Sequence, residues 1–258
     1  MNLSDSFEKI PVQIFKSPSE GSISTAHEIA ALIKEKQSRN ENCVLGLATG
    51  STPIKVYDEL VRLHKEDGLS FKNVITFNLD EYYPIVKDSP NSYWYFMHKH
   101  LFNHVDINPE NIHIPNGEWK KENIRKRCEE YENEIEAAGG IDLQLLGIGG
   151  NGHIGFNEPG SSLLSKTRLL VLENSTRIAN SRDFLNLNQV PKLAVSMGLS
   201  TILKAKKIVL LAWGNKAQIV AKAVEGNITD QIPASYLQQH NDCTFVLDEI
   251  AASELNAF

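Results

Sequence analysis

The chain has 258 residues, of which 41% are hydrophobic, and its net charge is −6. This length and composition provide a sizeable core for one large α/β domain without requiring a second. The negative charge opposes non-specific binding to nucleic acid, because phosphate backbones attract concentrated lysine and arginine. No apolar run approaches the roughly 20 residues needed to cross a bilayer, and the N-terminus lacks a signal-peptide pattern, so we expect a cytoplasmic protein.

Several short, nearly all-apolar runs alternate with helical patterns. Strands that are apolar on both faces belong in a parallel sheet covered by helices. The runs predicted to be strands are residues 44–48, 74–79, 141–146, 208–213 and 244–247. We therefore expect an α/β fold with a three-layer, doubly wound, mostly parallel sheet of the Rossmann-like kind, in a single domain spanning residues 1–258.

Helices are predicted between these runs. Thr52 and Pro53 supply a cap and a first-turn proline for a helix that ends at Gly68. Residues 122–138 and 215–225 each place apolar side chains on one stripe and are followed by glycine, as is typical of a helix end.

Two further features depend on composition alone. A polar stretch at about residues 160–188 carries few core signals, so we expect a lid-like segment there. Cys43, Cys128 and Cys243 are widely separated and lie in apolar contexts, which argues against a disulfide framework or a metal cage. We expect three buried, inert thiols.

Three predicted strand ends deliver polar residues to the edge of the sheet where open α/β proteins bind ligands. The first is the loop Thr49-Gly50-Ser51-Thr52, which leads into a helix. Backbone N–H groups at a helix N-terminus, joined by hydroxyls, form a site for a phosphate monoester. The alternative is that Ser51 or Thr52 is only an N-cap. The absence of a lysine after the glycine excludes a P-loop.

The second strand end carries the adjacent carboxylates Asp80 and Glu81. Adjacent side chains on an extended chain point in opposite directions, so only one of the two carboxylates should enter the cleft. Asp80 comes first after the apolar run and is the candidate base. The alternative is that both are turn residues.

The third strand end is a glycine-rich stretch that contains His153 and Glu158. Histidine exchanges protons in both directions near neutral pH, and its flanking glycines leave room for a substrate, although a purely structural histidine is the usual alternative. The glycines and Glu173 also match a dinucleotide fingerprint. We reject that interpretation because Pro159 and Gly160 interrupt the helix that the fingerprint requires.

Taken together, residues 45–53, 77–82 and 152–159 closely resemble the glucosamine-6-phosphate deaminases, and the similarity covers nearly the whole chain. The 6-phosphogluconolactonases share the Gly-His turn, but the continuation Phe156-Asn157-Glu158-Pro159 favours the deaminases. The resemblance implies conversion of glucosamine 6-phosphate and water to fructose 6-phosphate and ammonia. This reaction of amino-sugar catabolism couples an aldose–ketose isomerisation to loss of the amine.

The resemblance also implies residue roles. Asp80 is the base that moves the C2 proton, and His153, oriented and supported by Glu158, is the acid and base for ring opening. Asn151 stands where many family members have Asp, so a negative charge is missing, although an amide can still orient an imidazole. The implied phosphate-binding residues are Thr49, Gly50, Ser51, Thr52, Arg182 and Lys216. No metal or organic cofactor is implied, because this proton transfer needs only positioned acids and bases.

In allosteric family members, N-acetylglucosamine 6-phosphate binds between subunits. This chain keeps Ser161 and Arg168 of that site, but the basic position two residues on is Leu170, and the sequence ends at Phe258, short of the family's C-terminal segment. The resemblance therefore implies weak or absent activation by that ligand.

Two alternative functions stay open. A lactonase or plain sugar-phosphate isomerase would not release ammonia. A sugar-phosphate-sensing module should carry a DNA-binding segment, and residues before Val44 offer one helix without a basic face. The expected partner is a small amino-sugar phosphate, not nucleic acid or a membrane, and whether the chain forms a homo-oligomer is left open.

Overall fold

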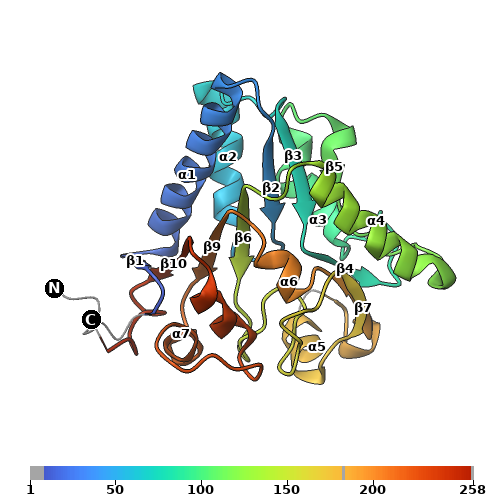
Figure 1. Ribbon diagram of the computed structural model, residues 1–258, viewed down its shortest axis with the longest axis vertical. Helices are drawn as coiled ribbons and strands as arrows, with labels where there is room; N and C mark the ends of the chain where they lie inside the picture. Colours follow the sequence, from blue (N-terminus) through green and yellow to red (C-terminus); the bar gives the residue numbers. More distant parts are fainter. Residues whose placement is uncertain (1–8, 182–183, 257–258) are drawn as a thin grey trace.

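The computed structural model describes residues 9–181 and 184–256, and a seven-stranded parallel sheet lies at its centre (Figure 1). The strand order is β1-β10-β9-β6-β2-β3-β5. The strands are β1 (Val12–Phe15), β2 (Cys43–Leu47), β3 (Val74–Asn78), β5 (Ile112–His113), β6 (Leu143–Gly147), β9 (Lys207–Ala212) and β10 (Cys243–Asp248). Each of the five predicted runs overlaps one of these strands, which confirms the predicted sheet.

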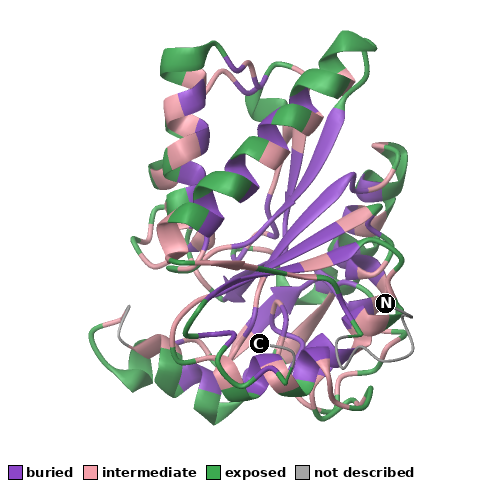
Figure 2. Cartoon of the chain, turned by 90° about the vertical axis from the view of Figure 1, so that its left-hand side faces the viewer, coloured by how far each residue is buried: buried purple, intermediate pink, exposed green. Residues whose placement is uncertain are grey.

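Helices cover both faces of this sheet. Leu45 and Leu47 point into one apolar core, whereas Val44 and Ala48 point into the other, as the alternation of side chains along a strand requires. The first face is covered by α1 (Pro18–Ser38), α2 (Ile54–Asp67) and α3 (Tyr93–His100), and the second by α4 (Ile124–Ala137), α6 (Leu199–Ile202) and α7 (Ala217–Val224). Figure 2 shows the buried strands between helices whose outer sides are exposed.

Short 3₁₀ helices connect several of these elements. They are η2 (Phe102–His104), η3 (Pro109–Asn111), η4 (Lys121–Asn123), η6 (Leu187–Gln189) and η7 (Pro233–Gln239).

Helix α2 ends where predicted, but its N-cap residue differs from the prediction. The helix ends at Gly68 as expected, with the glycine in the left-handed region at φ +69°. At its start, however, Pro53 itself occupies the N-cap position, and no side chain caps the helix. The prediction that Thr52 caps this helix is therefore wrong, and so is the alternative that Ser51 or Thr52 serves only as a cap.

A second, smaller sheet was not predicted. Its strands β4 (Asp80–Tyr83), β8 (Leu193–Ser196) and β7 (Arg168–Val171) are antiparallel in the order β4-β8-β7. The chain crosses from one sheet to the other at Leu79, whose N–H donates to Leu47 of β2 and whose carbonyl accepts from Met197 just after β8. Asp80 and Glu81 consequently lie in a strand, so the alternative that both are turn residues is wrong.

The segment at about residues 160–188 has more regular structure than its composition indicated. It contains strand β7 and helix α5 (Asn174–Asn180). Strand β7 pairs with β8, and α4 packs against it. That this segment closes over a ligand stays a prediction.

Two further predictions concern the cysteines and membrane-spanning helices. Cys43, Cys128 and Cys243 are buried and free, as predicted. Burial raises the pKa of Cys43 and Cys243 to about 12, so their thiols hold their protons at neutral pH. Within residues 9–181 and 184–256, no helix has the length and apolarity to cross a membrane.

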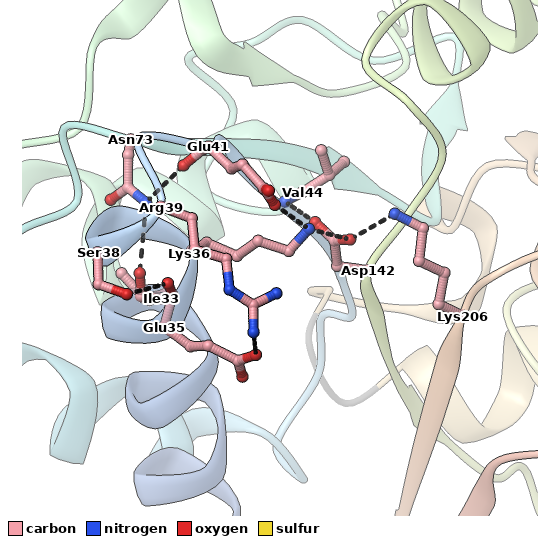
Figure 3. Close-up of polar contacts among 10 residues, drawn as sticks. All are labelled: Ile33, Glu35, Lys36, Ser38, Arg39, Glu41, Val44, Asn73, Asp142 and Lys206. Atoms are coloured by element: carbon pink, nitrogen blue, oxygen red, sulfur yellow. Dashed lines mark hydrogen bonds and ion pairs between the residues drawn. The ribbon is translucent and has the colours of Figure 1, made fainter.

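A buried charge cluster ties together the amino ends of three elements of the large sheet (Figure 3). Asp142 precedes β6, is 4% exposed, and accepts a hydrogen bond from the N–H of Val44 at 2.9 Å. Its carboxylate also lies 3.2 Å from Lys36 Nζ of α1 and 2.7 Å from Lys206 Nζ beside β9. Burial raises the pKa of Asp142, but the hydrogen bonds from Lys206, Val44 and Lys36 outweigh burial and hold that pKa below its ordinary value.

Substitution Asp142→Asn should lower the free energy of unfolding by about 1–3 kcal/mol near neutral pH, because the neutral amide cannot accept all the hydrogen bonds that the buried carboxylate accepts from Val44, Lys36 and Lys206. Since the folded-state pKa of Asp142 is depressed, its contribution is present above about pH 4 and is lost as the pH falls through the lower folded value. Urea unfolding across that range measures the loss. Lys206→Met, which removes a side chain that is 58% exposed, should cost less than about 1 kcal/mol, and equal losses in the two variants would contradict this account.

Candidate active site

A cavity of about 320 Å³ opens at the carboxyl ends of the parallel strands. In Figure 1 the arrowheads of β2, β3 and β6 point toward the part of the molecule that holds α5, α7 and β4. The residues predicted from sequence that line the cavity are Thr49, Gly50, Ser51, Thr52, Asp80, His153 and Lys216. Asn151 and Glu158 contact His153 from behind the cavity wall, and Arg182 lies outside the described residues.

The loop between β2 and α2 forms one wall. Gly50 adopts φ +94°, a conformation that favours glycine, and no atom lies within 4 Å of the position of an added Cβ. The loop is anchored from outside, since Trp213 Nε1 donates to the carbonyl of Thr52 at 3.2 Å. Because no side chain caps α2, the hydroxyls of Ser51 and Thr52 are not used for capping, and with Lys216 they form a wall suited to an oxyanion such as a phosphate.

Asp80 forms the floor of the cavity and is 5% exposed. Across the described part of the chain, no hydrogen-bond donor contacts its carboxylate, and an added Cβ on Gly155 would lie 3.5 Å from Asp80 Oδ2. Burial, and then the negative charge of Glu81, raises the pKa of Asp80 well above its ordinary value. A carboxyl group of this kind, facing a cavity, is suited to accept a proton from a bound molecule.

Glu81 points away from the cavity, as the alternation along an extended chain predicts. Its Oε1 accepts hydrogen bonds from the N–H groups of Tyr82 and Tyr93, and its Oε2 accepts from Trp94, each at 2.9 Å. Burial raises the pKa of Glu81 to about 7, although these three hydrogen bonds oppose the shift. The two neighbouring carboxylates therefore occupy different environments.

His153 belongs to a chain of three polar side chains. Its Nδ1 lies 2.7 Å from Asn151 Oδ1 and 3.3 Å from Glu158 Oε2, and Asn151 Nδ2 donates to the same oxygen of Glu158 at 2.8 Å. Burial raises the pKa of Glu158, but hydrogen bonding and charge interaction with His153 lower it below the ordinary value. When Nδ1 donates to Asn151, Nε2 is left as the nitrogen that accepts a proton.

The turn after β6 has a close contact that only glycine permits. The N–H of Gly149 donates to the carbonyl of His153 at 2.9 Å, and an added Cβ on Gly149 would lie 2.2–2.4 Å from three atoms of the imidazole ring. Gly152 in the same turn adopts φ +87°. No helix occurs in residues 148–167, which supports rejection of the dinucleotide fingerprint.

Two polar residues in the cavity wall were missed by the sequence analysis. Tyr93 comes from the first turn of α3, and Asn180 comes from the end of α5. Asn180 Nδ2 donates to the Tyr82 hydroxyl at 2.9 Å, which ties α5 to β4. Ser92 before Tyr93 is a recognisable N-cap, but nothing in the sequence indicates that this helix begins beside Asp80.

Comparison with known proteins gives the family. The model of the family described as glucosamine-6-phosphate isomerases/6-phosphogluconolactonase matches residues 16–246. The chain therefore belongs to this family.

Individual proteins of this family are also similar to this chain. A glucosamine-6-phosphate deaminase of Thermoanaerobacter sp. (strain X514) is 50% identical over 225 residues, which cover 87% of this chain and 88% of that protein. A glucosamine-6-phosphate deaminase-like protein of Bacteroides thetaiotaomicron is 50% identical over 249 residues, which cover 96% of this chain but 38% of that longer protein. A solved structure described as a monomeric glucosamine-6-phosphate deaminase superposes with a TM-score of 0.91 at 45% identity and covers 95% of this chain and 100% of its own.

Substitution Gly149→Ala should displace the imidazole, because the new methyl group would overlap the ring of His153. We expect a stability loss of about 1–3 kcal/mol and altered ¹⁵N chemical shifts of the His153 ring. Gly150→Ala is the matched control, since no atom lies within 4 Å of its added Cβ. Identical behaviour of the two variants would show that the close contact at Gly149 does not hold the ring.

Proposed function

We propose that this member of the glucosamine-6-phosphate isomerase/6-phosphogluconolactonase family is a glucosamine-6-phosphate deaminase. It converts glucosamine 6-phosphate and water to fructose 6-phosphate and ammonia, as a step of amino-sugar catabolism. Relatives at 50% sequence identity carry that name, and so does the solved structure at 45% identity. The observation that carries the proposal is that Asp80, His153 and residues 49–52 line the same cavity.

The phosphate group binds to the loop Thr49-Gly50-Ser51-Thr52 and to Lys216. Backbone N–H groups and hydroxyls of the loop donate to phosphate oxygens, and the Lys216 ammonium group offsets their charge. We assign Arg182 to the same phosphate on the family resemblance alone, because it lies outside the described residues. These contacts fix one end of the sugar, so that C1 and C2 reach the far side of the cavity.

Ring opening uses His153. Its Nε2 takes the proton of the anomeric hydroxyl and returns a proton to the ring oxygen, which breaks the bond between C1 and that oxygen. Asn151 holds Nδ1 at 2.7 Å and so fixes the ring orientation. The carboxylate of Glu158, 3.3 Å from the same nitrogen, stabilises the positive charge of the imidazolium between the two transfers.

Isomerisation and deamination use Asp80. In the open chain, the C1 aldehyde makes the C2 proton acidic, and the Asp80 carboxylate removes that proton. The substrate's ammonium group gives a proton to O1 at the same step, which leaves a neutral enolamine. Return of the proton from Asp80 to C1 leaves an imine at C2, and addition of water to C2 then expels ammonia and leaves the ketone. A carboxyl group that must hold a proton between two transfers benefits from burial, which strengthens its affinity for the proton.

The alternatives account for fewer residues. Hydrolysis of a lactone breaks no C–H bond and needs only one base to take a proton from the attacking water, so either Asp80 or His153 would be superfluous. A sensing module needs no acid or base at all. The predicted helix before β2 is α1, whose buried residues pack in the core against α2 and the sheet, so it does not form a separate DNA-binding segment.

The expected setting follows from the substrate. A sugar phosphate is a dianion that does not cross lipid bilayers, so the enzyme should meet its substrate in the cytoplasm. The sequence leaves the oligomeric state open, and a solved relative is described as monomeric. Size-exclusion chromatography with light scattering measures the state of this chain.

Activation by N-acetylglucosamine 6-phosphate should be weak or absent. Arg168, which the family resemblance places in the activator site, here donates from Nη1 to Asn157 Oδ1 at 2.9 Å, and Leu170 supplies no charge. Initial rates against substrate concentration should give a hyperbola that the activator leaves unchanged. A sigmoidal curve that the activator abolishes would refute this expectation.

Ammonia release from glucosamine 6-phosphate tests the function directly. Wild type should release it, Asp80→Asn should lose about 10³-fold or more in kcat, and His153→Gln should lose about 10²-fold, since each removes an acid–base group. Asp67→Asn, an exposed carboxylate at the end of α2, should leave the rate unchanged. Hydrolysis of a lactone without ammonia release would favour the lactonase alternative, and unchanged rates in both site variants would overturn the residue assignment.

A further inference from the structure

A second buried carboxylate beside the proposed base has no part in the mechanism above. Glu81 is 2% exposed and adjacent to Asp80, yet it lies outside the cavity wall. A buried carboxylate is costly unless it is hydrogen-bonded. The three N–H groups that donate hydrogen bonds to Glu81 therefore indicate its structural role.

Two of these N–H groups belong to the first turn of α3. The first four N–H groups of a helix have no partner within the helix. In α3, Glu81 accepts from the first two, Tyr93 and Trp94, while the N-cap Ser92 accepts from Tyr95 with its hydroxyl and from Phe96 with its carbonyl. All four are satisfied, and Glu81 attaches the start of α3 to strand β4.

This attachment determines where Tyr93 lies. The Tyr93 ring lines the cavity, stacks on Phe156 at 6.0 Å between centroids, and lies 4.9 Å from the ring of Tyr82. Asp80 and Thr49 are close enough to the Tyr93 hydroxyl to influence its pKa, which burial raises well above the ordinary value. The neutral phenol therefore lies near both the proposed base and the proposed phosphate loop.

The same carboxylate also acts on Asp80 through its charge. Like charges on neighbouring buried groups favour protonation of one of them, and Glu81 has three N–H donors to stabilise its charge whereas the Asp80 carboxylate has none among the described residues. Other ionisable groups around Asp80 are His153 and Lys216 in the cavity wall, Tyr93 of α3 and Tyr131 of α4.

We propose that Glu81 is a positioning residue for the reaction at Asp80. It fixes the start of α3, and with it the Tyr93 ring, in the cavity wall, and it places a negative charge beside the base. This inference rests on the proposed deaminase function and assigns that function a residue outside the cavity. Its two effects are separable, since one depends on hydrogen bonds and the other on charge.

The test is the pH dependence of ammonia release by Glu81→Gln. Glutamine has the same shape as glutamate but no charge. Its NH₂ group is a donor and would face one backbone N–H that donates to the carboxylate in wild type. Loss of that hydrogen bond should loosen the start of α3. We expect kcat/KM to fall about tenfold near neutral pH, because a loosened cavity wall positions the substrate less well. The acid limb of the profile, which reports the free-enzyme base, should move down by about 0.5–1 pH unit.

Ser92→Ala is the matched control. It removes the other cap of α3, the bond to Tyr95 at 3.0 Å, and leaves the charge of Glu81 in place. It should lower kcat/KM without moving the acid limb. Tyr93→Phe should raise KM more than it lowers kcat and should also leave the limb in place. An unmoved limb in Glu81→Gln, or the same movement in Ser92→Ala, would overturn the proposal.

A second readout does not depend on activity. The Asp80 carboxyl ¹³C signal, assigned by its loss in Asp80→Asn, should titrate at lower pH in Glu81→Gln than in wild type. Absence of ammonia release by wild type would refute the deaminase function. If Asp80 titrated at the same pH in Glu81→Gln as in wild type, the proposed role of Glu81 would be refuted. Should Glu81→Gln not fold, wild type decides the point: Asp80 and Glu81 should titrate in two mutually dependent steps, and independent single steps would contradict the coupling.

Discussion

The crossing of the chain at Leu79 is the constraint on which the cavity depends. Its N–H closes the last bond to β2 in the large sheet, and its carbonyl accepts from Met197 at the edge of the small one. Because both backbone groups are satisfied in different sheets, the next residue must leave the plane of the parallel strands. That residue is Asp80, so the proposed base sits at the junction of the two sheets, where the carboxyl ends of the parallel strands leave room for a ligand.

The small sheet also holds the histidine turn against this junction. Ser196 of β8 accepts from the N–H of Phe156 at 3.1 Å, and Asn157 donates to the carbonyl of Met197 at 2.8 Å. Arg168 of β7 donates to Asn157 from the other side at 2.9 Å. Hydrogen bonds of 3.1 Å or less thus fix elements that are distant in sequence relative to Asp80. Acid–base groups that act on one substrate require such fixed positions.

Residues at the ends of apolar strands were predictable, because parallel strands buried on both faces have a distinctive composition and their carboxyl ends share one edge. The pairing of β4 with β8 and β7 was not, since its residues Asp80–Tyr83 follow β3 almost directly and their partners lie far along the chain. Tyr93 and Asn180 were missed for the same reason: a helix start is recognisable locally, but its place in the fold depends on long-range packing. The cap assigned to Thr52 failed because Pro53 takes that position.

The cluster around Asp142 lies at the amino ends of the strands, whereas the cavity lies at their carboxyl ends. No residue is shared between the two, and effects of substitutions at such separated places generally add. Substitutions at the amino ends of the strands can therefore change thermal stability without changing the catalytic residues at the carboxyl ends. In this architecture, robustness and turnover need not be traded against each other.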